Sequence, residues 1–373
     1  MPRLQTIGFP RMRFEPGEKR VFLPDFIQMM ADLGLHVVIE EGYGSRLGYD
    51  RADFRQGNGR ITFGTRQEAF DQDLVLILRS PDADFSRMKP GTILMSMLHY
   101  HTRPNRIELF QQKDLKTISL DSIINDQDLR LVENMKAVAW NGLHVAFDVL
   151  DARWNGLIRP DGSPIKVLLL GTGMVGRHAV DAAVHLGNTE RNNDHIEKGS
   201  PGTVCQAVGR NLTNHPNEMI TLLKETDIVV DATQRRNPSE PVIPNDWIKH
   251  LPEHAILVDL SVDPYLPDAH PPVVRGIEGI PKGNLNKYIF HPDDPDWEDT
   301  IAPGAPTTHR RTAVTCYSWP GFHPEACMVH YAQQLRPMMP ILVEKGYDGL
   351  SLAGGHFERA LYRATLKGHV AES

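Results

Sequence analysis

Residues 165–187, IKVLLLGTGMVGRHAVDAAVHLG, decide the fold class of this chain. The apolar run IKVLLL ends at the glycine-rich segment GTGMVG, and a segment of small residues follows. This order predicts a strand, a tight turn and a helix, the arrangement that binds the diphosphate of a dinucleotide at the helix N-terminus. The first glycine permits the turn, the second lets the backbone approach the diphosphate, and the third allows close packing of helix on strand. The candidate cofactor-binding residues are therefore Gly171, Thr172, Gly173, Met174, Val175 and Gly176.

The second half of this fingerprint, an acidic residue about 20 positions further on, is not evident. Asp194 has roughly the right distance, but its surroundings in residues 188–202 do not resemble a strand. Alternatively TVCQAVGRN (203–211) is the second strand, with Gly209 in the place of the acid and Arg210 available for a 2′-phosphate, which would favour NADP. The same stretch could also be the third strand. The sequence therefore predicts NAD or NADP as cofactor and leaves the choice open.

Strand-like and helix-like segments alternate on both sides of the glycine-rich turn. Residues 25–35 carry apolar side chains at helical spacing, as an amphipathic helix does. Strands are expected at residues 4–9, 36–42, 73–79, 92–99 and 115–122, and again at 225–233 and 254–263. Alternation of this kind predicts parallel sheets with helices on both faces.

The segments between these runs suggest how the chain is divided. Residues 128–154 predict a long helix that bridges two lobes, and residues 325–366 a helical return onto the first lobe. We interpret 190–198 as a solvated loop and the proline-rich 291–311 as an extended surface segment. The predicted fold is α/β with two Rossmann-like, doubly wound lobes and a cleft between them. The expected domains are 1–130 completed by 326–373, the substrate lobe, and 131–325, the dinucleotide-binding lobe.

Composition excludes several classes of protein. The 373 residues carry a formal net charge of −7, which argues against a dedicated nucleic-acid binder. No apolar run reaches the 18 residues of a membrane helix, and the first residues lack the apolar core of a signal peptide. Three cysteines in a chain of this length fit reduced thiols. We expect a cytoplasmic enzyme with a small-molecule substrate and with neither nucleic acid nor membrane as partner.

Seven segments, in order, resemble one family. IGFPR…GEKRVFLP (7–24) is similar to its opening motif and GLHVVIEEGYGSRLGY (34–49) to its second strand. The likeness continues through DLVLILRSP, GTILMSMLH, GTGMVG, ETDIVVDAT and ILVDLSVD. The chain resembles the alanine dehydrogenase and pyridine-nucleotide-transhydrogenase family, which includes lysine-forming saccharopine dehydrogenase and carboxyethylornithine synthase. The resemblance implies two Rossmann-like lobes, with substrate contacts from the N-terminal lobe and nucleotide bound by the middle one.

The resemblance also implies roles for two arginines. Arg20 matches the family arginine that holds the substrate carboxylate, although it could also be a surface arginine beside Glu18. A guanidinium suits the first role because it binds carboxylates through two parallel hydrogen bonds. Arg79 occupies the place of a family lysine. Carboxylate binding would survive this change, but proton transfer would not, because a guanidinium stays protonated.

Catalytic roles follow from the same resemblance. His99 matches the catalytic histidine at the end of a family strand, and imidazole exchanges protons near neutral pH. His101 could support it if the strand continues. Asp263 matches the family aspartate that orders water or amine, whereas Asp259 is expected to be structural. The segment ETDIVVDAT adds Ala232 and Thr233 to the candidate cofactor-binding residues.

Three departures from the family pattern indicate a substrate other than plain alanine. Lys136 stands where alanine dehydrogenases carry a serine, the loop 318–326 is altered, and the acidic segment 292–299 has no family counterpart. Three further residues have metal-compatible spacing on one helical face, namely His323, Cys327 and His330. A fourth ligand is not evident, so we predict no metal site.

We predict an NAD(P)-dependent amino-acid dehydrogenase that acts on a C–N bond. One alternative is an opine- or saccharopine-type dehydrogenase that joins a 2-oxo acid to a second amino acid. Another is a non-catalytic NAD(P)-binding or transhydrogenase-like module. The sequence favours a homo-oligomer only weakly.

Overall fold

The chain divides into two compact units in the computed structural model, which describes residues 4–13 and 15–372. The first unit comprises Met1–Asn134 with His323–Ser373, and the second comprises Met135–Phe322. Their boundaries lie three to four residues from the domain boundaries expected from the sequence.

The first unit is built on a six-stranded parallel sheet of order β3-β2-β1-β4-β5-β6. Its strands are β1 Thr6–Phe9, β2 His36–Glu40, β3 Ile61–Gly64, β4 Leu74–Arg79, β5 Ile93–Met97 and β6 Lys116–Ser119. The five strands predicted in this region are confirmed, and β3 is an addition. Because β1 pairs with both β2 and β4, the chain order reverses at β1. In open α/β sheets, ligands bind at the carboxyl ends of the strands beside such a reversal.

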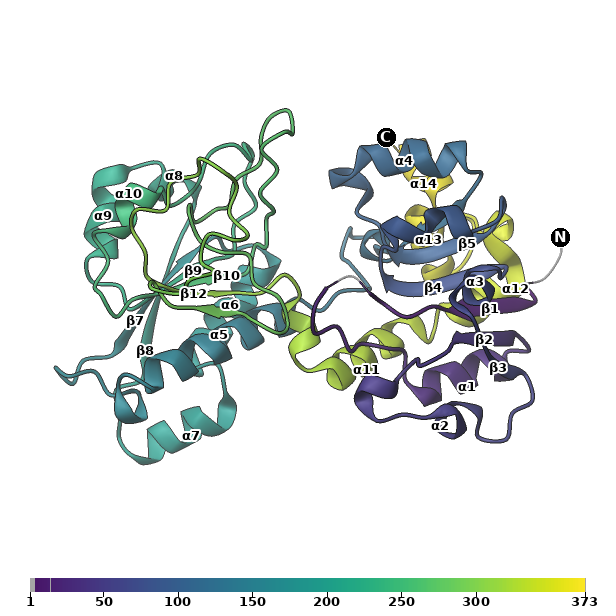
Figure 1. Cartoon of the computed structure of the whole chain (residues 1–373), viewed down its shortest axis with the longest axis horizontal. Helices are drawn as coiled ribbons and strands as arrows, with labels where there is room; N and C mark the ends of the chain where they lie inside the picture. Colours follow the sequence, from purple (N-terminus) through teal and green to yellow (C-terminus); the bar gives the residue numbers. More distant parts are fainter. Residues whose placement is uncertain (1–3, 14, 373) are drawn as a thin grey trace. The chain divides into compact units, whose positions relative to one another are not determined.

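Helices from both ends of the chain cover this sheet (Figure 1). They are α1 Pro24–Asp32, α2 Arg51–Arg55, α3 Arg66–Phe70, α4 Pro104–Gln112, α11 Pro324–Leu335, α12 Met339–Gly349, α13 His356–Ala364 and α14 Leu366–Glu372. Met328 and Leu342 of the C-terminal helices share one apolar core with Ile7 and Val37 of the sheet. The predicted helical return of the C-terminal segment onto the first lobe is therefore confirmed.

The second unit holds another six-stranded sheet, of order β11-β12-β10-β9-β7-β8. Its strands are β7 Ile165–Leu170, β8 Thr203–Val208, β9 Ile228–Asp231, β10 Ile256–Asp259, β11 Ile289–Phe290 and β12 Thr312–Thr315. All pairs are parallel except β11 with β12. β8 follows β7 and pairs directly with it, so residues 203–208 form the second strand and not the third.

The helices of the second unit are α5 Met135–Asp151, α6 Met174–Val184, α7 Thr189–Glu197, α8 Arg210–Thr213, α9 Pro216–Leu223 and α10 Asn245–Ile248. Short 3-10 helices complete the two units at Ser45–Leu47, Asp82–Arg87, Tyr100–Thr102, Leu120–Ser122, Asn155–Leu157 and Trp319–Phe322. None of the helices in the described part of the chain has the length and apolar character needed to cross a membrane.

The long helix predicted at 128–154 is shorter than expected. It begins at Met135 and lies wholly within the second unit. The preceding residues form a turn because the Asn125 side chain accepts hydrogen bonds from the backbone N–H groups of Gln127 and Leu129. Asp128 in this turn has a positive φ of 58°.

The prediction of a solvated loop at 190–198 is wrong, because the helix α7 includes all of these residues except Lys198. Asn188 caps this helix by accepting a hydrogen bond from Arg191 N. His195 is buried and its Nε2 lies 2.7 Å from Gly156 O, so a tertiary contact supports a helix that has little apolar character.

The segment 291–311 contains neither helix nor strand, in agreement with an extended segment. It does not lie wholly on the surface, however. Trp297 belongs to this segment and its ring is buried. Its Nε1 donates a hydrogen bond of 3.0 Å to Gly279 O.

Candidate functional site

The glycine-rich turn has the geometry of a dinucleotide site. Gly171 directly follows β7 with a φ of 87°, a conformation that only glycine adopts at no steric cost. A Cβ at Gly171 would lie 2.9 Å from Ala232 O, and one at Gly176 would overlap Gly171 O. Both glycines therefore allow a backbone approach that any other residue would prevent.

The start of α6 offers room for an anionic group. Gly173 is the N-cap residue, and no side chain there hydrogen-bonds the first N–H groups of the helix. A Cβ at Gly173 would meet no atom within 4 Å. Free N–H groups beside open space are the features that a diphosphate requires, so these residues fit a dinucleotide.

Ala232 and Thr233 follow β9 and lie beside this turn. Ala232 N donates a hydrogen bond to Leu170 O, and Thr233 donates from N and Oγ1 to Asp231 Oδ1 at 3.0 and 2.7 Å. Burial raises the pKa of Asp231. The structure thus brings the two residues predicted from ETDIVVDAT next to Gly171, as a nucleotide site requires.

The residues that would contact the adenosine ribose follow β8. Gly209 directly follows the strand and Arg210 is the exposed first residue of α8, with its Nη2 3.2 Å from Gln234 O. Asp194, in contrast, lies within α7 and not at a strand end. It therefore does not occupy the position of the acid in the fingerprint. A role for Arg210 in binding a 2′-phosphate stays a prediction.

A buried charged network follows β9 and β10 in the same unit. Asp259 is opposite Asp231 in the sheet register and contacts the guanidinium of Arg275. Its Oδ1 also accepts hydrogen bonds from Ser261 N and Oγ. Removal of Arg275 would leave the buried carboxylate of Asp259 without its ion-pair partner, so Arg275 helps to hold the end of β10 in place.

Asp263 lies four residues after Asp259 and forms an ion pair. Arg235 donates to its Oδ2 from Nη2 at 2.7 Å and from Nε at 3.3 Å. Arg235 also donates to the carbonyls of Pro238 and Glu240, which fixes the position of its guanidinium. Asp263 is about one-third exposed, so its carboxylate is held but accessible. Its proposed chemical role stays a prediction.

At the carboxyl edge of the first sheet, His99 is paired with a carboxylate. It follows β5, and its Nδ1 lies 3.1 Å from Asp121 Oδ2. Asp121 Oδ1 also accepts hydrogen bonds from His99 N and from Ser119 Oγ. Burial raises the pKa of Asp121, but the bonds from His99 and Ser119 outweigh burial and hold this pKa well below its usual range. Asp121 is therefore an anion that orients the imidazole.

The exposure of His99 suits proton exchange. Its side chain is 49% exposed, so a ligand can reach the ring edge opposite Asp121. His101 does not lie on the same strand, because β5 ends at Met97 and residues 100–102 form a 3-10 turn. Its ring instead contacts His369 edge to face, with 4.8 Å between ring centroids.

Arg20 is buried beside Glu18, so the alternative of a surface arginine is wrong. Its side chain is 3% exposed, with Nη2 2.5 Å from Glu18 Oε2 and Nε 2.9 Å from Oε1. Burial raises the pKa of Glu18, but Arg20, together with the charge of Arg79, lowers it below its ordinary value. Arg79 ends β4 and is half-buried.

Two residues of α11 complete this part of the site. Burial raises the pKa of the Cys327 thiol and of the Tyr331 phenol, while the charge of Arg20 opposes both shifts. The charge of Arg79 also acts on Tyr331. Tyr331 and Asp121 are not predicted from the sequence, because neither belongs to a motif of adjacent residues.

The metal-compatible spacing on α11 has another explanation. His330 Nε2 lies 2.8 Å from Glu133 O and 2.9 Å from Gln334 Nε2. Within the described residues, no group of three or more metal-ligating side chains is placed to hold an ion.

The departures from the family pattern occupy separate positions. Lys136 is the second residue of α5, with its Nζ 5.4 Å from the ring centroid of Trp140. Trp319 Nε1 donates to Asp259 O at 2.9 Å in the second unit. Glu325 accepts a hydrogen bond from the Tyr49 hydroxyl in the first unit.

Two doubly wound sheets, one with a glycine-rich turn at a helix N-terminus, define an α/β protein of the dinucleotide-binding class. Comparisons with known families agree with this class. The sequence model "Alanine dehydrogenase/PNT, N-terminal domain" matches residues 10–139, and "Alanine dehydrogenase/PNT, C-terminal domain" matches residues 158–264. The chain belongs to the alanine dehydrogenase/PNT family.

Individual relatives are distant. The chain is 22% identical to alanine dehydrogenase of Bacillus subtilis, over 69% of this chain and 70% of the relative. It is 21% identical to NAD(P) transhydrogenase subunit alpha of Haemophilus influenzae, over 68% of this chain but only 55% of that subunit. Among solved structures, an L-alanine dehydrogenase is similar at a TM-score of 0.68 and 19% identity, covering 97% of this chain and 94% of the other. A transhydrogenase from Sinorhizobium meliloti follows, with a TM-score of 0.61, 16% identity and coverages of 96% and 97%.

Proposed function

We propose that this protein is an NAD(P)-dependent amino-acid dehydrogenase that interconverts a 2-amino acid and a 2-oxo acid. The observation that carries the proposal is the His99–Asp121 pair at the end of β5, next in the sheet to β4 and its Arg79. A carboxylate-binding arginine beside an oriented imidazole suits proton transfer at the nitrogen of a carboxylate-bearing substrate. The family and its alanine dehydrogenase relatives support this reaction class.

The cofactor would be held by the glycine-rich turn, the N-terminus of α6 and the adjacent Ala232 and Thr233. Arg210 is the residue proposed to contact the ribose or its 2′-phosphate. When bound, the nicotinamide supplies the hydride acceptor or donor.

The remaining roles belong to side chains of this chain. Arg79 binds the substrate carboxylate with Arg20, whose position is set by Glu18. As hydride leaves the substrate Cα, His99 takes a proton from the nitrogen, and Asp121 stabilises the imidazolium that results. Arg235 donates to Oδ2 of Asp263, and Oδ1 is the atom proposed to order the attacking water or the incoming amine.

Arg79→Ala is expected to raise KM for the 2-oxo acid by about 10- to 100-fold, because a charge-assisted pair to the substrate carboxylate is lost. Arg79→Lys should lose less, since it keeps the charge without the two-bond geometry. Arg60→Ala is the matched control, because Arg60 directly precedes β3 at the amino edge of the same sheet. Steady-state kinetics check this prediction, and an unchanged KM in Arg79→Ala would exclude Arg79 from the substrate site.

The proposed function is tested by oxidation of NADH and NADPH with a panel of 2-oxo acids, each with ammonium or with lysine, ornithine or arginine. Turnover with ammonium is the expected result. Turnover only with an amino acid as amine donor would replace it with the opine- or saccharopine-type reaction. Tight cofactor binding without turnover of any 2-oxo acid would contradict the proposal and favour a transhydrogenase-like module.

A further inference from the structure

Three arginines surround one buried carboxylate at the carboxyl edge of the first sheet. Glu40 ends β2 and its side chain is 2% exposed. Arg11 and Arg13 come from the loop after β1, and Arg66 opens α3. Arg11 Nε lies 3.2 Å from Glu40 Oε1, Arg66 Nη1 lies 2.7 Å from Oε2, and Arg13 Nη2 contacts Oε1. We refer to these four residues as the Glu40 arginine cluster.

The cluster carries an excess of positive charge. Its next neighbour is Asp84, which pairs with Arg66 at 2.5 Å and with Arg87 at 2.7 Å. Four guanidinium groups therefore share two carboxylates here, in a chain whose net charge is −7. A local excess of this sign in an acidic protein favours an anionic ligand.

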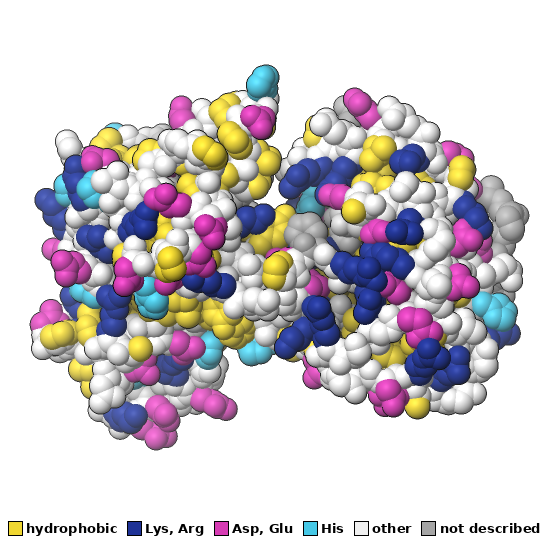
Figure 2. Space-filling view, viewed as in Figure 1, with side chains coloured by type: hydrophobic (Ala, Val, Ile, Leu, Met, Phe, Trp, Pro, Cys, Tyr) yellow, Lys and Arg dark blue, Asp and Glu magenta, His cyan; other side chains and the backbone are white. Residues whose placement is uncertain are grey.

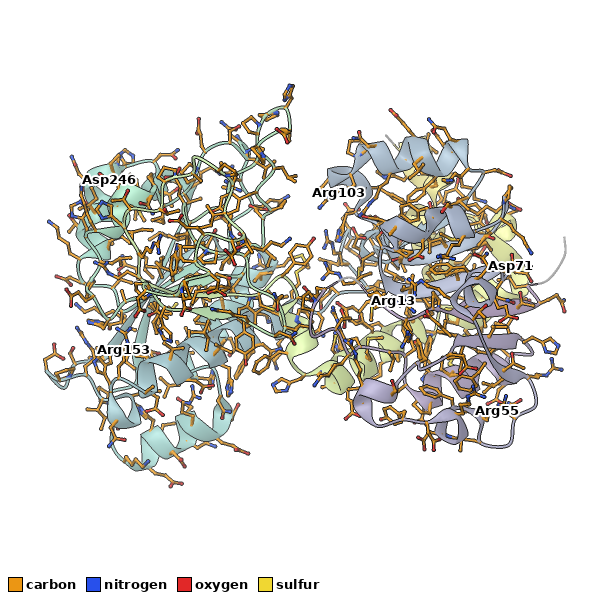
Figure 3. All side chains as sticks on the ribbon, viewed as in Figure 1. Arg13, Arg55, Asp71, Arg103, Arg153 and Asp246 are labelled. Carbon is orange, nitrogen blue, oxygen red and sulfur yellow. The ribbon has the colours of Figure 1, made fainter. Side chains whose placement is uncertain are left out.

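The two more exposed arginines of the cluster are held in position by the buried carboxylate of Glu40. The side chains of Arg13 and Arg11 are 53% and 37% exposed, whereas that of Arg66 is 14% exposed. Glu40 accepts hydrogen bonds from the two exposed guanidinium groups and from Arg11 N. A guanidinium has five N–H donors, so Arg13 keeps donors for a second anion. Figure 2 shows Lys and Arg side chains gathered on the visible face of this unit, and Figure 3 labels Arg13 there.

The cluster and His99 lie along the same edge of the sheet. Asp82, in the turn after β4, accepts a hydrogen bond of 2.5 Å from Arg106 Nη2. Arg106 Nη1 donates at 2.9 Å to Leu98 O, directly before His99. Asp82 and Asp84 belong to the same 3-10 helix, which therefore contacts the cluster through Asp84 and the residues after β5 through Asp82.

We infer that the Glu40 arginine cluster binds a second carboxylate of the substrate, with Arg13 as the principal ligand. The bound substrates then carry two carboxylates, of which Arg20 and Arg79 hold the one next to the reacting carbon and Arg13 holds the other. This inference rests on the proposed function. The second carboxylate belongs either to the side chain of the 2-oxo acid or to an amino acid that serves as amine donor.

The test compares the wild type with Arg13→Ala and Arg13→Lys. Arg55→Ala is the matched control, because Arg55 is an exposed arginine of α2, labelled in Figure 3. Its Cζ lies 5.7 Å from the centroid of the Phe63 ring. Calorimetry measures binding of 2-oxoglutarate and oxaloacetate against pyruvate and 2-oxobutyrate, and kcat/KM is measured for each with ammonium. Pyruvate with glutamate or lysine as amine donor forms the second arm.

The expected result is a loss of about 10- to 100-fold in dicarboxylate affinity and kcat/KM in Arg13→Ala, with monocarboxylates unchanged. Arg13→Lys should have a dicarboxylate affinity between those of the wild type and Arg13→Ala, and Arg55→Ala should match the wild type. An effect confined to the ammonium arm places the second carboxylate on the oxo acid, and one confined to the other arm places it on the amine donor.

Failure of the inference is distinguishable from failure of the proposed function. Equal losses for mono- and dicarboxylates with ammonium in Arg13→Ala, or no loss in either arm, would overturn the inference while turnover still supports the dehydrogenase. Dicarboxylate binding that depends on Arg13 without turnover of any oxo acid would support the anion site and overturn the reaction.

Discussion

His99→Ala lowers kcat/KM for reductive amination by about 10²- to 10⁴-fold, the range that a positioned general acid or base contributes. The reason is that His99 carries a half-exposed imidazole held by Asp121 at the end of β5. Substrate binding should change far less, because the carboxylate is assigned to Arg20 and Arg79. Steady-state kinetics and calorimetry of the 2-oxo acid together separate the two effects.

His101→Ala is the matched control for this prediction. His101 is two residues away and contacts His369, without a contact to Asp121 among the described residues. Asp121→Asn should also lower kcat, since it removes the anion that stabilises the imidazolium. Activity of His99→Ala within twofold of the wild type would remove His99 from the reaction.

Gly173→Ala is expected to weaken NAD(P)H binding by about 10- to 100-fold with the melting temperature unchanged. A Cβ at Gly173 meets no protein atom within 4 Å, so the folded chain accommodates it. The added methyl group would occupy the space above the N-terminus of α6 that the diphosphate needs. Fluorescence titration with NADH and NADPH, with a thermal melt of the same sample, measures both quantities.

Gly176→Ala is the contrasting variant in this prediction. Its Cβ would overlap the backbone oxygen of Gly171, so strain of about 1–3 kcal/mol should lower the melting temperature. Retained cofactor affinity in Gly173→Ala would contradict the assignment of the turn as a diphosphate site.

The sequence predicts most of the fold because most of its strands are apolar and buried on both faces. β4, β7 and β9 are fully or almost fully buried, and all three are evident as continuous apolar runs. β3 was not predicted because its four residues, ITFG, include one buried side chain. α7 was misread because its support, the bond from His195 to Gly156 O, joins residues 39 positions apart.

The residues of the candidate site also divide into those that a local sequence pattern predicts and those that only the folded structure brings together. The glycine turn is predictable because its function depends on adjacent residues of fixed spacing, and His99 because it ends a strong strand. Asp121 was missed because its contact with His99 depends on β5 and β6 being neighbours. The Glu40 arginine cluster likewise joins residues from three separate segments, which no local pattern connects.

Reductive amination of a 2-oxo acid by hydride transfer to its Cα is the central claim, and mass spectrometry of the product tests it most directly. The protein is incubated with a 2-oxo acid, ammonium and NADH or NADPH carrying deuterium at both C4 positions of the nicotinamide. We predict a 2-amino acid with one deuterium at Cα, and loss of this product in His99→Ala. A labelled 2-hydroxy acid, or no labelled product despite cofactor binding, would contradict the account.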